Sequence, residues 1–440
     1  MLKTSVPNYF KQRRDQFMKK AGNVALIVAS NPVFRRNHDV HYPFRQDTNF
    51  YYLSGFDEEN SFLVLLPSTG KGGHRSILFV QDRNLEREIW DGERYGVERA
   101  GDIFGIDEVY PVANFDQELP KLLPAVEKVY LQLGIHPAMD LRLLGLIKQA
   151  TDRLGRTGRS VLTVADPASI IGEMRLLKSE EEIEIMRKAC SISAKAHMQI
   201  MKDIRPGMNE AEVEAMVDYN FRRNGCQRNG YGSIVASGAN ATCLHYVKNN
   251  EMMRDGTLLL IDAGGEYDYY SADITRVSPV GRSFSREQAK VYDAVLRVQK
   301  DCVAMLKPGV KFDDLQNRAR EGLVHELLEL ELLKGEAKKL LETKAYHRFY
   351  PHNIGHWLGM EVHDTGLYRE DDSSRTFEAG MVVTVEPGLY IQPYDTEAGE
   401  KFRGIGVRIE DDILITKGGN ENLTREALKE RSDIEALRQY

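Results

Sequence analysis

Cysteine is scarce in this chain. Only four of its 440 residues are cysteines, at positions 190, 226, 243 and 302, and no two of them form a C-x-x-C pair. A chain of this length can bury a large apolar core and does not need disulfide bonds to fold. The cysteine content therefore indicates a reducing, cytoplasmic compartment.

Long apolar runs and an excess of positive charge are also missing. No stretch of about 20 apolar residues exists that could span a bilayer. The first residues, MLKTSVPNYFKQRR, lack the apolar run of a signal peptide. The formal net charge is −7, whereas nucleic-acid-binding proteins usually carry a basic patch. We therefore expect neither a membrane nor a nucleic acid as a partner.

The first part of the chain has the pattern of an α/β domain. Its 42% hydrophobic and 28% charged residues are those of a globular protein, and the length predicts two or three domains. Apolar runs of strand length occur at 23–29, 62–66, 76–80 and 129–133, and residues 139–154 have helical periodicity. The sequence predicts a smaller N-terminal α/β domain over 1–172.

The second part mixes strands with long helices. Ser179 and Glu182 have capping-box spacing, and a helix over 210–223 is expected to stop at Asn224-Gly225. Further helices are predicted over 285–306 and 312–342, the latter heavily charged and expected to be a solvated outer helix. Strands return from Gly380 to about Thr416. This pattern predicts an α+β domain over 173–440.

Five ionisable residues in this domain end or interrupt short apolar stretches. Burying an unpaired carboxylate costs several kcal/mol, so buried carboxylates are usually paired or bound to metal. Glu386 is followed by Pro-Gly, which forces a turn and holds the carboxylate at a strand end. The five residues are Asp262, Asp273, His356, Glu386 and Glu410.

Some of these residues also have a simpler structural interpretation. Taken alone, Asp262 and Asp273 are more simply explained as aspartates that cap turns, and His356 as a core histidine. However, Gly264-Gly265 between the aspartates looks like a hairpin turn, which would bring both carboxylates to the same end of neighbouring strands.

The surroundings of these residues favour a metal site. His352 and His363 lie close to His356 in the sequence. Arg408 precedes Glu410 by two, so both side chains point to one face of a strand, where the arginine could orient a ligating carboxylate.

The ligand set, rich in oxygen with one nitrogen, suits Mn²⁺, Co²⁺ or Zn²⁺. Four carboxylates balance the charge of two divalent ions, and paired ions in hydrolases activate water and polarise a carbonyl. The expected chemistry is attack by a metal-bridging hydroxide. Glu386 would carry the proton to the leaving nitrogen, and His363 or His245 would stabilise the oxyanion.

The flanking motifs resemble those of the pita-bread metallopeptidases, and among them aminopeptidase P, the Xaa-Pro aminopeptidase. The segments that carry the resemblance are HNIGHWLGMEVHD at 352–364, TVEPGLY at 384–390 and RGIGVRIEDD at 403–412. RQDTNFYYLSGF at 45–56 is similar to the creatinase/prolidase-type N-terminal domain of the same group. The resemblance implies release of the N-terminal residue from peptides with proline in second position.

The resemblance also implies roles for individual residues. The five ionisable residues would be metal ligands, with Asp273 and Glu410 bridging two ions, most often Mn²⁺. His245, His352 and His363 would bind substrate or the intermediate. Arg408 matches an active-site arginine, Tyr231 would line the pocket, and the family resemblance implies a dimer or tetramer.

Three alternatives stay open at this point. A prolidase, which cleaves only Xaa-Pro dipeptides, shares the fold and the five ligands. A non-catalytic pita-bread module would bind peptides or proteins without cleaving them. Trp90 either closes the proline pocket from an N-terminal domain, its own or that of a neighbouring subunit, or packs in an ordinary core.

Overall fold

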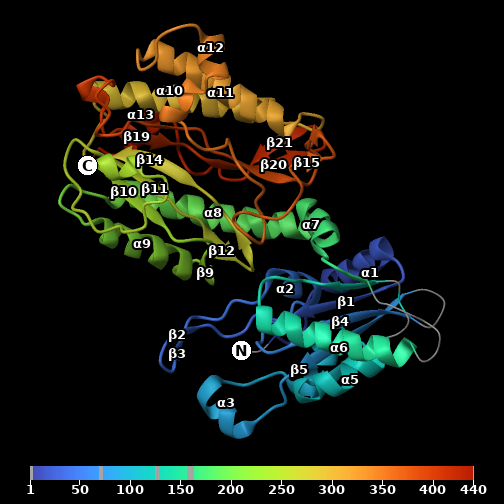
Figure 1. The fold of residues 1–440 in the computed structure, drawn as a ribbon. Coiled ribbons are helices and arrows are strands. Elements are labelled where there is room, and N and C mark those ends of the chain that lie inside the picture. Colours follow the sequence, from blue (N-terminus) through green and yellow to red (C-terminus); the bar gives the residue numbers. More distant parts are fainter. Residues whose placement is uncertain (1–2, 69–72, 124–125, 127, 156–162, 440) are drawn as a thin grey trace. The chain divides into compact units, whose positions relative to one another are not determined.

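The chain divides into two compact units, Met1–Met174 and Arg175–Tyr440 (Figure 1). The computed structural model describes residues 3–68, 73–123, 126, 128–155 and 163–439. The boundary predicted at 172/173 lies within helix α7 (Ala168–Leu176). Each unit is described separately below.

The N-terminal unit is built on a six-stranded sheet with the order β6-β5-β4-β1-β7-β8. Strand β4 runs antiparallel to both β1 and β5, while the β1–β7, β7–β8 and β5–β6 pairs are parallel. The strands are β1 (Val24–Ala29), β4 (Phe62–Pro67), β5 (His74–Val80), β6 (Glu108–Pro111), β7 (Lys128–Leu131) and β8 (Thr163–Ala165). The four predicted apolar runs form β1, β4, β5 and β7, whereas the short β6 and β8 lack such runs.

Helices and a short hairpin complete this unit. Helix α6 buries Leu143, Leu146, Ile147 and Ala150 in the same apolar cluster as the sheet residues. The helices are α1 (Tyr9–Ala21), α2 (Thr48–Ser54), α3 (Leu85–Asp91), α4 (Gly96–Phe104), α5 (Phe115–Leu122) and α6 (Pro137–Gly155), and the hairpin pairs β2 (Arg35–Asn37) with β3 (Val40–His41). This is the predicted α/β domain.

Trp90 lies on α3, where no side chain is buried. Its own side chain is 86% exposed. Core packing of Trp90 within this chain, one of the two interpretations of this residue, is therefore wrong.

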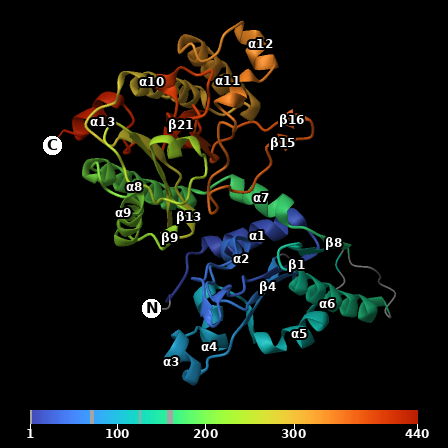
Figure 2. The same ribbon diagram turned by 60° about the vertical axis from the view of Figure 1, so that its left-hand side comes forward.

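Small sheets form the centre of the C-terminal unit, between two layers of helices (Figures 1 and 2). The main sheets have the orders β10-β11-β14 and β17-β20-β21. These strands are β10 (Ile234–Ser237), β11 (Leu258–Asp262), β14 (Thr275–Pro279), β17 (Val382–Val385), β20 (Asp411–Thr416) and β21 (Gly419–Asn422). A third three-stranded sheet has the order β13-β12-β9, formed by β9 (Arg228–Asn229), β12 (Gly265–Tyr267) and β13 (Tyr270–Ser271). Two short pairs are formed by β15 (Arg369–Glu370) with β16 (Ser373–Ser374) and by β18 (Gly388–Tyr390) with β19 (Gly406–Arg408).

Alternation along β11 shows why its apolar run is continuous. Leu258 and Leu260 join the core formed with α10 (Arg286–Met305) and α11 (Phe312–Glu329). Leu259 and Ile261 pack with α8 (Glu180–Asp203) and α9 (Glu210–Arg223). Successive side chains of a strand point to opposite faces, so a strand covered on both faces has no polar position. Asp262, the next residue, therefore stands out as a carboxylate at the end of a fully buried strand.

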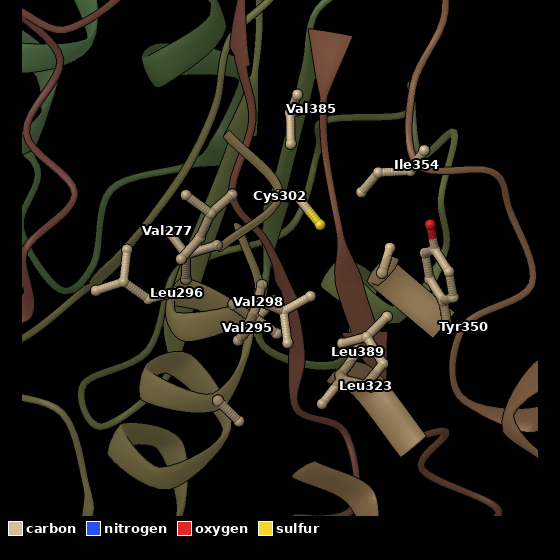
Figure 3. Close-up of a cluster of buried hydrophobic side chains, with 14 of the residues drawn as sticks. Val277, Val295, Leu296, Val298, Cys302, Leu323, Tyr350, Ile354, Val385 and Leu389 are labelled. Carbon is tan, nitrogen blue, oxygen red and sulfur yellow. The ribbon is translucent and has the colours of Figure 1, made fainter. Parts of the chain in front are cut away.

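The larger core joins strands from both main sheets to α10 and α11. Figure 3 shows side chains such as Val277 and Leu389 gathered with Val295 and Leu323 from the two helices. Each fully buried aliphatic side chain contributes about 1.5–3 kcal/mol. This core fixes the strand ends on which the ionisable residues stand.

Predicted helix ends agree with the structure for α8, α9 and α10 and differ in a fourth case. Ser179 and Glu182 form a capping box at the start of α8 (Glu180–Asp203), and α9 spans Glu210–Arg223. Helix α10 spans Arg286–Met305 and α13 Arg431–Leu437. The single helix predicted over 312–342 is wrong: it is split into α11 (Phe312–Glu329) and α12 (Ala337–Glu342), because Glu331 and Gly335 have φ values of +57° and +124°.

The prediction of a hairpin turn at Gly264-Gly265 is also wrong. The turn lies at Asp268-Tyr269, with φ values of +47° and +68°, between β12 and β13. A Cβ on Gly264 would lie 1.7 Å from the main-chain oxygen of Ala272, so this glycine permits close packing of two backbone segments. β11 and β14 are still antiparallel neighbours, with Asp262 opposite Thr275.

The strand region also continues past the predicted end. β20 ends at Thr416 as expected, but β21 turns back on it, and α13 follows. In the part of the chain that the structure describes, no helix has both the length and the apolar character needed to cross a membrane.

Candidate metal centre

A cavity of about 540 Å³ in the C-terminal unit brings the five predicted ionisable residues together. The same cavity is lined by Tyr231, His245, His352, His363 and Arg408. Every predicted site residue of this unit therefore lies in one place. Trp90 belongs to the other unit and is not among the lining residues.

Strand ends position the carboxylates. Asp262 is the last residue of β11, Asp273 lies just before β14, and Glu386 directly follows β17. Glu410 lies between β19 and β20. Because these strands are held by the apolar core, the four carboxylates are fixed by the sheet rather than by flexible loops.

His356 faces this group of carboxylates. Its Nε2 lies 3.3 Å from Asp273 Oδ2 and 3.6 Å from Glu386 Oε1. Its Nδ1 lies 3.0 Å from the main-chain oxygen of Trp357. A proton on Nδ1 would be donated to that oxygen, which leaves Nε2 with a lone pair for a metal ion.

The spacing of the donor atoms suits a cation. Ligand atoms of Asp273, His356 and Glu410 all lie within 4.8 Å of one another. One imidazole and several carboxylates form a donor set that divalent metal ions accept. The residues present therefore fit the divalent metal of this kind of site.

Electrostatics point the same way. Burial raises the pKa of Glu386 to about 7, and the nearby Asp273 and Asp262 charges add to this while His356 and Arg408 oppose it. Burial and neighbouring carboxylates also raise the pKa values of Asp273 and Glu410. For His356, burial lowers the pKa, but Asp273 and Glu386 raise it to about 9. The cluster is short of positive charge, which bound metal would supply.

Arg408 is the one arginine among the described residues that line the cavity. It is ion-paired with Asp262, donates from Nε to Thr275 Oγ1 (3.0 Å), and from Nη1 to Tyr390 Oη (3.0 Å). Thr275 Oγ1 in turn donates to Glu410 Oε2 at 2.6 Å. Arg408 thus fixes one ligand directly and another through Thr275.

Sequence reasoning missed Thr275 and Tyr390. Thr275 follows Asp273 by two residues, a spacing that places both side chains on one side of an extended chain. Tyr390 ends the segment TVEPGLY, whose glutamate had already been singled out. Both signals were in the sequence, but neither residue type suggested a metal site by itself.

Tyr231 joins the first two aspartates. Its hydroxyl lies 2.5 Å from Asp262 Oδ1 and 2.5 Å from Asp273 Oδ1. Burial, followed by the charges of Asp262 and Asp273, raises the pKa of Tyr231. The phenol therefore stays protonated and holds the two carboxylates at a common point.

The three histidines outside the ligand set differ in burial. His352 is held by Tyr390, with 2.9 Å from Nε2 to Oη, and burial with the charge of Arg408 lowers its pKa to about 3. The His363 ring centre lies 4.4 Å from that of His356, and burial lowers its pKa. His245 is exposed at the cavity. His352 is therefore a neutral imidazole at neutral pH.

Two acidic residues near His363 serve another purpose. Asp364 is buried with Arg175 and Lys178, 3.1 Å from the Lys178 Nζ. Glu361 is paired with Arg175 at 3.1 Å. These carboxylates belong to a separate ion cluster.

Comparisons with known proteins agree over the whole chain. Residues 184–417 match metallopeptidase family M24, and residues 10–130 match the aminopeptidase P N-terminal domain. The Xaa-Pro aminopeptidase of Escherichia coli (strain K12) is 41% identical over 434 residues, which is 97% of either chain. Xaa-Pro aminopeptidase 3 of Homo sapiens is 36% identical, over 94% of this chain and 80% of the human one.

Solved structures give the same result. Aminopeptidase PepP of Pseudomonas aeruginosa has a TM-score of 0.95 at 39% identity, over 99% of this chain and 98% of that one. Zinc-substituted aminopeptidase P of Escherichia coli in complex with product has a TM-score of 0.93 at 39% identity, over 99% and 98%. The predicted fold, a pita-bread domain after a smaller α/β domain, is confirmed, as is the prediction of an enzyme. The chain belongs to metallopeptidase family M24 and carries the N-terminal domain of aminopeptidase P.

Proposed function

We propose that this chain is an Xaa-Pro aminopeptidase, which releases the N-terminal residue of peptides that have proline in second position. The observation that carries the proposal is the buried group of carboxylates and one imidazole at a cavity that Arg408 and His352 also line. Relatives that carry this activity in their names match nearly the full length of the chain, including its N-terminal domain. We assign catalysis to the domain over 173–440 and an accessory role to that over 1–172.

In this proposal the five clustered residues, Asp273 and Glu410 among them, would hold two divalent ions. Mn²⁺ is the first candidate, and Co²⁺ or Zn²⁺ would also suit the donors. When bound, such ions would activate water and polarise the scissile carbonyl. Tyr231 and Arg408 keep Asp262 in place for this, through the contacts described above.

Glu386 is the proton carrier of the proposed reaction, besides being a ligand. It takes a proton from the attacking water and gives it to the proline nitrogen as the C–N bond breaks. Its Oε2 lies 3.7 Å from His352 Nδ1, another residue that lines the cavity. The leaving group is a secondary amine, which needs that proton.

The remaining cavity residues bind the peptide. His245 and His363 donate hydrogen bonds to the oxyanion, while Tyr231, His352 and Arg408 line the space for substrate. An Xaa-Pro bond has no N–H, so a pocket for it must recognise the ring by shape. We assign Trp90 to the wall of that pocket in a homo-oligomer, a dimer or tetramer, where a neighbouring copy would supply it. Cytoplasmic localisation completes the proposal.

Two assays test this function. The purified protein is stripped with a chelator and assayed on a Xaa-Pro-Yaa tripeptide and a Xaa-Pro dipeptide, with Mn²⁺, Co²⁺ and Zn²⁺ added back separately. Cleavage of the tripeptide that depends on added metal is expected. Cleavage of the dipeptide alone would identify a prolidase, and binding without cleavage would identify a non-catalytic module.

A further inference from the structure

A second cavity adjoins the candidate metal centre. It also has a volume of about 540 Å³. Four residues line both cavities: Asn353, Gly355, His356 and Tyr368. The two spaces therefore share a rim that includes one of the proposed metal ligands.

One face of helix α11 also lines this second cavity. Asp313, Gln316, Asn317 and Arg320 line the cavity, at the i, i+3, i+4 and i+7 spacing of one helix face. Other residues of the same helix, including Leu323, pack into the core. The charged helix that the sequence predicted to be merely solvated thus presents a polar stripe to a cavity.

Arg320 is the distinctive group of this stripe. It is half-buried, and among the residues that the structure describes no carboxylate lies within ion-pair distance of it. Its Nη1 donates to Asn317 Oδ1 at 3.4 Å. The neighbouring Arg318 is paired with Asp301 at 2.6 Å, and Arg369 across the cavity with Asp313 at 3.1 Å. Arg320 is thus a cation beside a cavity with room for an anion.

The other polar groups of the cavity suit a peptide. Asn317 on α11 and Asn353 on the shared rim are exposed amides, and amides can both donate to and accept from a peptide backbone. Gln316 Oε1 accepts from the Ile354 N–H at 2.9 Å and ties the shared rim to α11. A guanidinium binds carboxylates with two parallel hydrogen bonds.

We propose that this second cavity receives the part of the peptide beyond the scissile bond, and that Arg320 binds a carboxylate of that part. This inference rests on the proposed function. An aminopeptidase holds the N-terminus of its substrate at the reacting centre, so the rest of the chain must leave the catalytic cavity. The shared rim at Asn353 and His356 opens one such route.

Peptide length and terminal charge provide the test. Xaa-Pro peptides of three to five residues are compared as free acids and as C-terminal amides, in the wild type, Arg320→Gln and Arg318→Gln. Each residue adds about 3.3–3.6 Å of reach, so the free acid should be preferred once its carboxylate reaches Arg320. We expect a roughly tenfold preference in kcat/KM that Arg320→Gln removes and Arg318→Gln keeps.

The source of the carboxylate is resolved by amidated peptides with Asp or Glu after proline. If these peptides restore the preference, the carboxylate that binds Arg320 is that of a side chain. If they do not, it is the carboxylate of the peptide's C-terminus. The inference would be overturned if the wild type and Arg320→Gln had the same ratio of kcat/KM for acid over amide at every peptide length. The same holds if the two proteins treat peptides with and without a side-chain carboxylate alike.

Direct binding separates this inference from the proposed function. The product-like peptide Pro-Yaa-Zaa, as acid and as amide, is titrated into the metal-loaded protein by calorimetry. Weaker binding of the acid to Arg320→Gln, with unchanged binding to Arg318→Gln, is expected even if no Xaa-Pro peptide is cleaved. Equal acid binding by all three proteins would overturn the inference while tripeptide cleavage still stood.

Discussion

Glu410 and Asp411 are neighbours in the sequence, are both buried, and have opposite electrostatics. Burial and nearby carboxylates raise the pKa of Glu410, which faces the cavity. Asp411 is paired with Arg276 and Lys429, and these cations hold its pKa below the ordinary value although burial opposes them. Burial alone therefore does not mark a metal site. Glu410 differs from Asp411 because it faces a cavity with other carboxylates, whereas Asp411 faces two cations.

The largest expected effect is the loss of activity on removing Glu410, the buried carboxylate that faces the cavity. Glu410→Ala should lower kcat by at least about a thousandfold, because a ligand of the proposed ions is lost. Metal content, measured by elemental analysis, should fall while the circular dichroism spectrum stays unchanged. The control is Glu421→Gln. It removes the partly exposed ion-pair partner of Arg187, and Glu421 is not among the residues that line the cavity. Full turnover by Glu410→Ala would remove this residue from the centre.

The paired carboxylate should act on stability instead. Asp411→Ala leaves Arg276, which is almost fully buried, without its partner and should cost about 3–5 kcal/mol of unfolding free energy. Glu421→Gln should cost no more than about 1 kcal/mol, because exposed ion pairs contribute little. Thermal unfolding of the two variants beside the wild type measures the difference. Equal melting temperatures would show that the Arg276 cluster does not stabilise the fold.

A second paired cluster predicts the pH dependence of stability. Burial opposes ionisation of Asp364, but Arg175 and Lys178 lower its pKa below the ordinary value. A depressed folded-state pKa contributes stability above the unfolded pKa of about 4, and that stability is lost as pH falls through the folded value. Asp364→Asn should therefore reduce the loss of stability on acidification below about pH 4.

Denaturant unfolding at a series of pH values measures this slope. Glu361→Gln is the matched control, because Glu361 pairs with the same Arg175 but is 45% exposed at its side chain. An unchanged acid slope in Asp364→Asn would contradict the assignment of this stability to the buried pair.

The smallest effect is expected from a change at Thr275, whose hydroxyl connects Arg408 to the proposed metal ligand Glu410. Thr275→Val keeps the shape but removes the hydroxyl that donates to Glu410 and accepts from Arg408. Loss of such an orienting contact costs about 10–100-fold in metal affinity or activity. Metal titration followed by calorimetry checks this, and Thr275→Ser should restore the affinity. Wild-type affinity in Thr275→Val would show that Glu410 needs no such support.

Local patterns in the sequence determined much of this protein. The apolar runs marked strands β1, β4, β5 and β7, the capping box marked the start of α8, and Asn224-Gly225 marked the end of α9. The five ionisable residues were found because each broke an apolar stretch, a local anomaly that needs no knowledge of neighbours. These features depend on a few adjacent residues, so they can be read from the chain alone.

Only the tertiary structure decided which charges meet. It paired Asp411 and Asp364 with distant cations and left Glu410 and Glu386 facing a cavity, and it joined Arg408 to Glu410 through Thr275. It also showed that Gly264 allows the backbone to pack closely against Ala272 and does not form a turn. The physical reason is that pairing free energy depends on distances between groups far apart in the sequence, which local periodicity does not encode.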